Sequence, residues 1–264
     1  MQSIKNLTIV ILVLLSMTSC EDVIELDLET SEPQTIIEAT IDATTQTATV
    51  LLTKSNGFYD QDAPTNLSGA SILLTDDTGL DYSLSETESG VYQMENIDLS
   101  TATDFSIVID INGEVYEASA EVPSPVALDS IIVSSGGAPP FGGDGSEMVI
   151  AQFEDAPDVK NYYRIKAYEN DTLLAGTYTL IDDEFRGDGE VTSIGVRALF
   201  EVENTVTLEL LSTSKDYYDY FLQLSSQSGE GGNSTTPFNP RGNFANNGLG
   251  YFGIYHSSAL SVEL

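Results

Sequence analysis

The chain has 264 residues and carries 42 Asp and Glu against 9 Lys and Arg, a formal net charge of −33 at pH 7. Such a charge repels the phosphate backbone of nucleic acids, and the cations stand apart from one another along the sequence, so nucleic-acid binding is excluded. An apolar fraction of 41% over this length is enough to fill the cores of one large or two ordinary domains.

The N-terminus has the layout of a secretory signal peptide. One cation, Lys5, precedes an apolar run over residues 7–15, and small polar residues follow. The run is too short to cross a bilayer as a helix. We therefore predict that residues 1–19 are a targeting segment that is removed from the mature chain.

The sole cysteine, Cys20, stands directly after the residues MTS. This arrangement resembles the bacterial lipobox, in which the thiol is acylated and becomes the first residue of the mature chain, so we predict a lipid anchor at Cys20. A buried free thiol is the alternative. Glu21 and Asp22 open an acidic segment over residues 20–34, which resembles the export tether of surface lipoproteins in Bacteroidota; a merely solvated tether is the alternative.

Residues 35–122 contain seven short β-type segments separated by turn residues, which predicts a β-sandwich of immunoglobulin-like size. The clearest hairpin joins FSIVIDI to EVYEASAEV through Asn112-Gly113, a pair typical of a type I′ turn. Alternate residues from Phe105 to Ile111 are apolar, so we expect one face of this hairpin to be buried.

Pro123 and Pro125 interrupt the strand pattern, and we place a domain boundary at residues 123–126. Residues 126–264 return to β-type segments and end in a closing strand. The predicted fold class is mainly β: an N-terminal immunoglobulin-like β-sandwich followed by a second antiparallel β domain with one amphipathic helix.

That helix is expected near residues 214–228, where the apolar spacing changes to helical periodicity. Ser214 is placed to cap its N-terminus, and Asp216 lies in the first turn, where a negative charge is favoured.

Several segments, taken in order, resemble one known family. They are the Cys20-Glu21 start, IIEATI, LLTKS, GASILLTDD, INGEVYEA, NYYRI, DYYDY and, most specifically, PFNPRGNFANNGLGYFG. In this order they resemble the Bacteroidota outer-membrane lipoproteins known as domain of unknown function 4249. The resemblance implies a lipoprotein associated with a TonB-dependent outer-membrane receptor, and it supplies no catalytic residues.

Catalysis is not expected from the residues present. The only histidine, His256, lies near the end of an expected strand, where a structural role is more common than that of a general base. No nucleophile elbow, zinc-protease motif or phosphate-binding loop occurs. Paired carboxylates could serve a hydrolase, but among 42 acids such pairs arise by chance, so we do not predict an enzyme.

No cofactor is expected other than weakly bound Ca²⁺. Carboxylates gather in three turn-like segments, and the candidate ligands are Asp60, Asp62, Asp76, Asp77, Asp182, Asp183 and Glu184. None of the segments fits an EF-hand loop, and solvated turns on an acidic surface are the favoured alternative.

The loop over residues 237–253 is the predicted partner or ligand surface. It combines one cation with aromatic and amide side chains: Arg241, Phe238, Asn239, Phe244 and Asn246. The alternative is a tight crossover whose phenylalanines fill the core. Ser130 and Thr172 stand in Asp-Ser/Thr-apolar triplets that resemble the Bacteroidota O-glycosylation motif, with chance as the alternative.

Together these features predict a two-domain β-rich lipoprotein tethered through Cys20 to the outer membrane and exposed at the cell surface. We expect it to act without catalysis, as an accessory or ligand-capture subunit of a TonB-dependent receptor. A free-standing adhesin or structural surface protein is the alternative, and an unrecognised hydrolase is the third.

Overall fold

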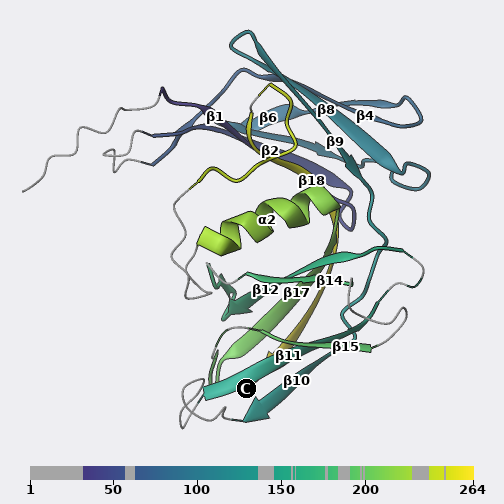
Figure 1. Cartoon of the computed structure of the whole chain (residues 1–264), viewed down its shortest axis with the longest axis vertical. Coiled ribbons are helices and arrows are strands. Elements are labelled where there is room, and N and C mark those ends of the chain that lie inside the picture. The colour runs from purple at the N-terminus through teal and green to yellow at the C-terminus, as the bar shows by residue number, and fades with distance from the viewer. Residues whose placement is uncertain are drawn as a thin grey trace, which may run out of the picture. The chain divides into compact units, whose positions relative to one another are not determined.

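Figure 1 shows the computed structural model of the chain. It describes residues 32–56, 63–135, 146–155, 157, 159–175, 178–183, 191–196, 198, 200–227, 238–246 and 248–264, and residues Pro33–Leu264 form one compact unit. The predicted signal peptide and nearly all of the predicted tether lie outside the described residues. Within the described ranges, no helix has the length and apolar character needed to cross a membrane.

Among the described residues, nine strands precede the predicted boundary: β1 (Thr35–Asp42), β2 (Thr47–Lys54), β3 (Thr65–Asn66), β4 (Ser71–Asp76), β5 (Asp81–Ser83), β6 (Ser85–Glu88), β7 (Val91–Glu95), β8 (Asp104–Ile111) and β9 (Glu114–Glu121). The remaining elements are β10 (Ser130–Ser135), β11 (Ser146–Glu154), β12 (Tyr162–Glu169), β13 (Thr172–Leu173), β14 (Thr179–Asp182), β15 (Val191–Gly195), β16 (Phe200–Glu201), β17 (Thr205–Thr213), α2 (Lys215–Gln227) and β18 (Leu249–Glu263). The described residues are therefore mainly β with one helix, as the sequence predicts.

One large sheet joins the two halves of the sequence. Its strand order is β13-β12-β17-β18-β1-β2-β7-β6, with β14 paired to β12 and β3 paired to β2. Strand β18 pairs in parallel with β1 and antiparallel with β17, so the last strand of the chain enters the sandwich that the sequence pattern assigned to residues 35–122 alone. This long-range pairing ties the two predicted domains into one compact unit.

Two smaller sheets cover one face of the large sheet. The sheet β5-β4-β8-β9 encloses a first core, with Ile37, Phe105 and Phe252 among its fully buried members. The sheet of β10, β11, β15 and β16 encloses a second core around Phe153 and Leu208. Along the chain, the buried residues pass from the first core to the second near residues 123–126, where the sequence predicts a boundary. The C-terminal segment is the exception, because its buried residues return to the first core.

The β8–β9 hairpin follows the sequence pattern closely. Asn112 and Gly113 have φ of 52° and 82°, so both occupy the left-handed region that a type I′ turn requires, and Ile111 pairs with Glu114. Strand β8 alternates exposed and buried residues along its whole length. The predicted hairpin and its buried face are confirmed.

Helix α2 lies on the opposite face of the large sheet, against β18 (Figure 1). Tyr217 of α2 packs against Tyr251, Gly253 and Tyr255, which alternate along β18 with core residues such as Phe252. A Cβ atom on Gly253 would lie 2.7 Å from Cβ of Tyr217, so this close approach requires glycine.

Ser214 occupies the N-cap position of α2, because its O accepts from N of Tyr218 at 3.2 Å, but its side chain takes a partner other than the predicted first turn. Its side-chain Oγ accepts a hydrogen bond from N of Ile254 at 3.2 Å, and its own N donates to O of Ile254 at 2.8 Å. Because Ser214 is 4% exposed, its hydroxyl serves the buried junction with β18 instead of the first turn of α2.

Candidate binding surface

The residues of the predicted partner loop divide between core and surface. Phe244 is buried in the first core. Phe238, Asn239 and Arg241 are exposed, with Phe238 44% exposed. Asn246 is also exposed, but its Nδ2 donates to O of Val115 at 2.9 Å and so fastens the loop to β9. The structure thus leaves three of these side chains available to a partner.

Helix α2 holds the exposed segment by its main chain. N of Arg241 donates to Oε1 of Gln223 at 2.8 Å, and Nε2 of Gln223 donates to O of Arg241 at 3.2 Å. N of Phe238 donates to Oε1 of Gln227 at 3.2 Å. Because the two glutamines are four residues apart, they lie on one face of the helix and fix the backbone of the segment while its side chains stay exposed.

A tight crossover follows this segment. Nδ2 of Asn243 donates to O of Ser119 at 3.0 Å and to O of Phe252 at 2.9 Å, while its Oδ1 accepts from N of Phe252 at 2.9 Å. A Cβ atom on Gly242 would lie 1.7 Å from O of Gly250, so no larger residue fits there. This part of the predicted partner loop therefore closes the end of the first core.

The acids Asp76 and Asp77 organise the turn between β4 and β5. Oδ1 of Asp76 accepts from Oγ1 and N of Thr78 at 2.7 and 2.9 Å and from N of Leu80 at 2.9 Å. Asp77 accepts from Oγ1 and N of Thr103 at 2.8 and 3.2 Å. The hydroxyl of Thr78 lowers the pKa of Asp76, and that of Thr103 lowers the pKa of Asp77.

The other cation candidates are not brought together in the described part of the chain. Oδ2 of Asp183 accepts from N of Asn161 at 2.7 Å, and Asp182 ends β14. Asp60, Asp62 and Glu184 lie outside the described residues. Among the residues that the structure does describe, no group of three His, Cys, Asp or Glu is arranged to hold a metal ion.

The predicted modification sites differ in setting. Cys20, Glu21 and Asp22 lie outside the described residues. Oγ of Ser130 donates to Oε1 of Gln152 at 3.0 Å within a sheet, whereas Thr172 is exposed in the short strand β13. Of the two hydroxyl candidates, Thr172 is exposed and Ser130 is half-buried.

His256 lies half-buried on β18. Burial lowers the pKa of its imidazole, partly offset by the charge of Asp42 and by a hydrogen bond with the backbone of Pro123. In the strand register it lies opposite Ser212 of β17, which is 1% exposed.

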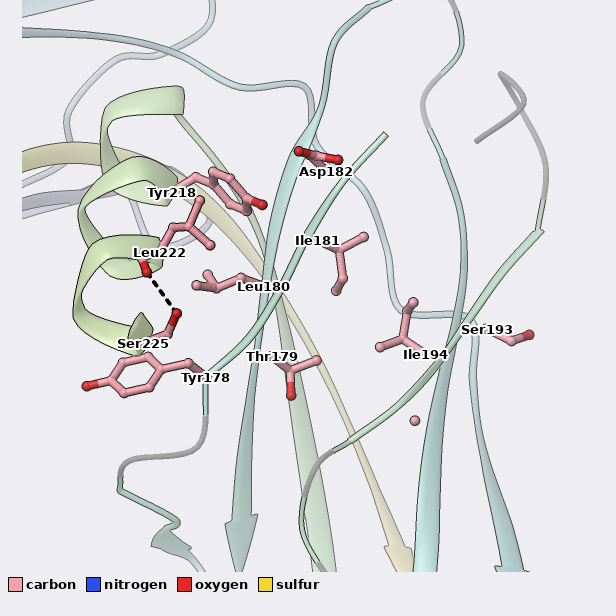
Figure 2. A pocket seen from close by; sticks show the side chains of 11 residues that line it. Tyr178, Thr179, Leu180, Ile181, Asp182, Ser193, Ile194, Tyr218, Leu222 and Ser225 are labelled. Carbon is pink, nitrogen blue, oxygen red and sulfur yellow. Dashed lines mark hydrogen bonds between the residues drawn. The ribbon is translucent and has the colours of Figure 1, made fainter. Parts of the chain in front are cut away.

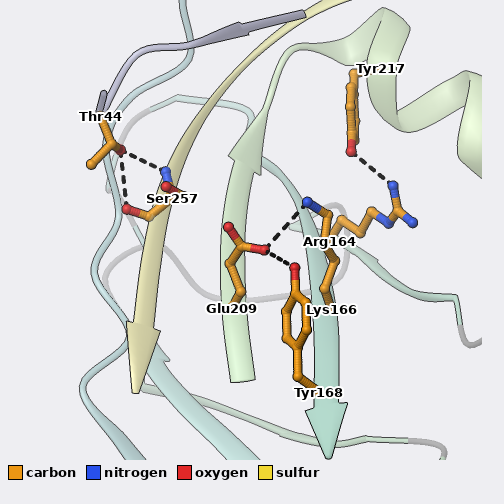
Figure 3. A network of polar contacts seen from close by, with 7 residues as sticks. All are labelled: Thr44, Arg164, Lys166, Tyr168, Glu209, Tyr217 and Ser257. Atoms are coloured by element: carbon orange, nitrogen blue, oxygen red, sulfur yellow. Dashed lines mark hydrogen bonds and ion pairs between the residues drawn. The ribbon is translucent and has the colours of Figure 1, made fainter. Parts of the chain in front are cut away.

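A cluster that the sequence analysis did not single out surrounds Arg164 of β12. The guanidinium carbon lies 3.8 Å from the ring centre of Phe221 and 5.7 Å from that of Tyr178. Nη1 donates to the hydroxyl of Tyr217 at 2.8 Å (Figure 3). Tyr217 also contacts Tyr251 and Tyr255. Arg164 of β12 is thus surrounded by side chains from α2, from Tyr178 just before β14 and, through Tyr217, from β18.

The tyrosines of this cluster stay protonated well above neutral pH. Burial raises the pKa of Tyr217, Tyr220, Tyr251 and Tyr255, and the charge of Arg164 opposes this at Tyr217. Their hydroxyls are therefore neutral groups that can donate hydrogen bonds under physiological conditions.

The next cation on the same face of β12 is neutralised by an acid. Nζ of Lys166 lies 3.3 Å from Oε2 of Glu209, and the hydroxyl of Tyr168 donates to the same oxygen at 2.8 Å (Figure 3). Burial, followed by this hydrogen bond, raises the pKa of Tyr168 to about 12. Lys166 is thus paired with a carboxylate, whereas Arg164 faces aromatic rings and a phenol.

A groove of about 620 Å³ lies between α2 and the strands β14 and β15 (Figure 2). Tyr218, Leu222 and Ser225 line it from the helix, and Ile194 lines it from β15. Its remaining lining residues include Tyr178, Leu180, Ile181 and Asp182 around β14. Leu180 is the register partner of Arg164, but Arg164 itself is not among the residues that line the groove.

A signal for this site was present in the sequence NYYRIKAYE. Alternate polar residues Tyr162, Arg164, Lys166 and Tyr168 place two of the chain's nine cations on one face of a strand. Pattern alone marks this as an ordinary solvated face, because the aromatic partners come from distant segments.

The model for the family described as "Domain of unknown function (DUF4249)" matches residues 21–261 of this chain. A comparison with curated proteins finds no match. Among solved structures, a tetra-tandem repeat in the extending region of a large adhesion protein is 16% identical, with 88% of this chain and 49% of that chain covered and a TM-score of 0.22.

Two further solved structures are similar at the same low level. A DUF4785 family protein from Legionella pneumophila is 9% identical, covering 67% of this chain and 52% of that chain, with a TM-score of 0.22. The FN1–FN3 domains of chicken CNTN1 are 11% identical, covering 68% of this chain and 60% of that chain, with a TM-score of 0.23. The chain spans about half to three fifths of the length of these structures, and TM-scores this low carry no argument about function.

Proposed function

The chain belongs to the DUF4249 family, and on that premise we propose that it is a non-catalytic lipoprotein of the outer-membrane surface. In this proposal it captures a ligand or holds a partner as an accessory subunit of a TonB-dependent receptor. The Cys20 sequence context supports the lipid anchor, and the acidic residues that follow support a tether between the membrane and the compact unit.

The observation that carries the binding role is the surface around α2. The helix fixes the backbone of Phe238 and Arg241 through paired glutamine hydrogen bonds, yet leaves both side chains exposed. Exposed aromatic and arginine side chains on a rigid backbone are the residue types that dominate binding energy at protein interfaces. A surface held in this way supports recognition of a partner without any catalytic group.

A pull-down from detergent-solubilised outer membranes tests the receptor association. The tagged wild-type chain is expected to recover one large β-barrel receptor, identified by mass spectrometry. The double variant Phe238→Ala/Arg241→Ala is expected to lose that receptor while keeping its melting temperature, because both side chains are exposed. Leu80→Ala, which removes an apolar side chain of similar exposure at 49%, serves as the matched control.

The outcomes separate the possible roles. Recovery of the chain alone contradicts the receptor association and favours a free-standing adhesin. Recovery of the receptor by wild type and double variant alike means that the association uses another surface.

The lipid anchor is tested separately with Cys20→Ser. Loss of the only thiol is expected to move the protein from the membrane fraction to the soluble fraction and to remove the acyl mass from the mature chain. A Cys20→Ser chain that remains with the membranes would contradict a lipid anchor at this residue.

A further inference from the structure

We propose that two copies of this chain associate through strand β10, which pairs antiparallel with β10 of the second copy about a two-fold axis at Ile132. The pairing continues the sheet of β10, β11, β15 and β16 into the same sheet of the second copy. It goes beyond the receptor association and uses none of the residues assigned to that surface.

Strand β10 is an edge strand with one open side. It pairs with β11 and, in the described part of the chain, with no other strand. Figure 1 shows it at the end of its sheet, outside β11. The main-chain N–H and C=O groups on the open side of an edge strand are a template for a further strand. A strand from another molecule can therefore continue the sheet on this side.

The open edge of β10 lacks the charges that protect other edges. No charged residue lies between Ser130 and Ser135, although the chain carries a net charge of −33. By contrast, the edge strand β6 exposes Glu86 and Glu88, and the loop over residues 243–246 donates hydrogen bonds to main-chain carbonyls of β9. Charged side chains and covering loops prevent edge strands from pairing between molecules. Strand β10 has no charge to oppose a second strand.

The sequence of β10 is self-complementary about Ile132. Opposed residues of an antiparallel pair lie on the same face of the sheet, so residues of the same parity must be joined. Centred on Ile132, the register places Ile131 opposite Val133 of the second copy. It also places Ser130 opposite Ser134, so apolar side chains meet apolar ones and hydroxyls meet hydroxyls. A two-fold interface requires such self-complementarity, so a second copy is the partner that this edge fits.

Pairing would cover apolar side chains that now face water. Ile132 is 41% exposed and lies opposite Ile150 of β11. Val133 is 36% exposed, although its register partner Val149 is fully buried in the second core. Burial of these side chains favours association. Because one short strand pair buries less than the roughly 1,600 Å² of a standard interface, we expect a dissociation constant of roughly 10–100 µM.

Sedimentation velocity of the mature chain tests the proposal. Expression from residue 20 with Cys20→Ser gives a chain without lipid that contains the whole compact unit Pro33–Leu264. It should show a monomer–dimer equilibrium between about 1 and about 500 µM. Since two strongly acidic chains repel each other, raising NaCl from about 0.1 to about 1 M should tighten the dimer. A dimer that weakens with salt would indicate contacts between opposite charges and would overturn the proposal.

Charges placed on the two-fold axis locate the interface. Ile132→Glu and Ile132→Lys each bring like charges opposite one another, so each should weaken the dimer by about tenfold or more. A mixture of the two variants should associate more tightly than either alone, because a carboxylate then faces an ammonium group. The matched control is Leu73→Glu, which adds the same charge at a 37% exposed side chain of β4, between β5 and β8, and should dimerise like the wild type.

A cysteine on the axis tests the register. Ile132→Cys in the Cys20→Ser chain supplies the only thiol, and a mild oxidant should link two copies by a disulfide, because directly opposed Cβ atoms lie about 4.5–5.5 Å apart. Leu73→Cys should stay unlinked. Should a charged variant fail to fold, this comparison decides the matter.

Each contrary result overturns the inference. These results are a wild-type chain that stays monomeric throughout the concentration range, equal behaviour of Ile132→Glu and Leu73→Glu, no gain on mixing the two charged variants, or equal cross-linking of Ile132→Cys and Leu73→Cys.

Discussion

Replacing Gly253 with alanine is expected to force α2 away from β18. The new Cβ atom would lie 2.7 Å from Cβ and 2.8 Å from Cδ2 of Tyr217, well inside the contact distance of about 3.5 Å for carbon atoms. Tyr217 is 2% exposed and packs against Tyr251 and Phe221, so its ring has little room to move. Helix or strand must shift, and much of the aromatic cluster shifts with it.

The size of the effect follows from known costs of overpacking. Extra atoms in a filled core cost about 1–3 kcal/mol. For a chain of this length, each kcal/mol lowers the melting temperature by about 2–4 °C, so Gly253→Ala should lower it by about 2–12 °C. The near-ultraviolet circular dichroism should also change, because the chain contains no tryptophan and its signal comes chiefly from tyrosines such as those around α2.

Gly195 provides the matched control for this measurement. It also lies in a strand, β15, but the nearest atom to an added Cβ is Sδ of Met148 at 3.9 Å, an ordinary contact. Gly195→Ala should therefore melt within about 1 °C of the wild type or slightly above it. If Gly253→Ala melts like Gly195→Ala and keeps the wild-type dichroism, the described packing of α2 on β18 is refuted.

Three further outcomes follow from individual contacts. Asn243→Ala should destabilise the chain by about 1–3 kcal/mol, measured by urea unfolding, because main-chain groups of Ser119 and Phe252 lose their side-chain partner; an unchanged midpoint would contradict this. Burial lowers the pKa of His256, so its contribution to stability is present above the unfolded pKa near 6.5 and is lost as pH falls below it. His256→Gln should flatten the stability profile in that window, and a profile identical to wild type would refute the assignment. The pKa of Tyr168 is about 12 in the folded chain and about 10 when unfolded, so its contribution to stability is lost as pH rises from 10 to 12. Tyr168→Phe should remove one late-titrating phenol from the absorbance titration, and an unchanged titration curve would contradict the assignment.

The local elements of this protein could be read from the sequence. The alternation of β8 and the Asn112-Gly113 turn depend on side-chain period and on backbone conformations available to those residues, so they are encoded within a few positions. The same holds for α2, observed over Lys215–Gln227 where the helix was expected near 214–228. Each of these elements depends on its own residues more than on distant partners.

The neighbours of each element were decided only by the tertiary structure. Alternation along β18 says which residues share a face, but not that β18 would lie between β1 and β17 and serve both cores. Ser214 has a sequence position suited to a helix cap, yet the approach of Ile254 gave its hydroxyl a different partner. In both cases the contact that decides the outcome is made by residues far away in the sequence, which local pattern does not specify.

The candidate site shows the same division. Sequence alone marked the loop around Arg241 but left open whether its phenylalanines would pack inside or face a partner, and the structure buried Phe244 and exposed Phe238. Arg164 looked like one polar residue in an alternating strand. Its aromatic walls come from α2 and from Tyr178 just before β14. Its setting as a partly buried cation, with no acidic partner among the described residues, therefore arises only when segments more than ten and more than fifty residues away close around it.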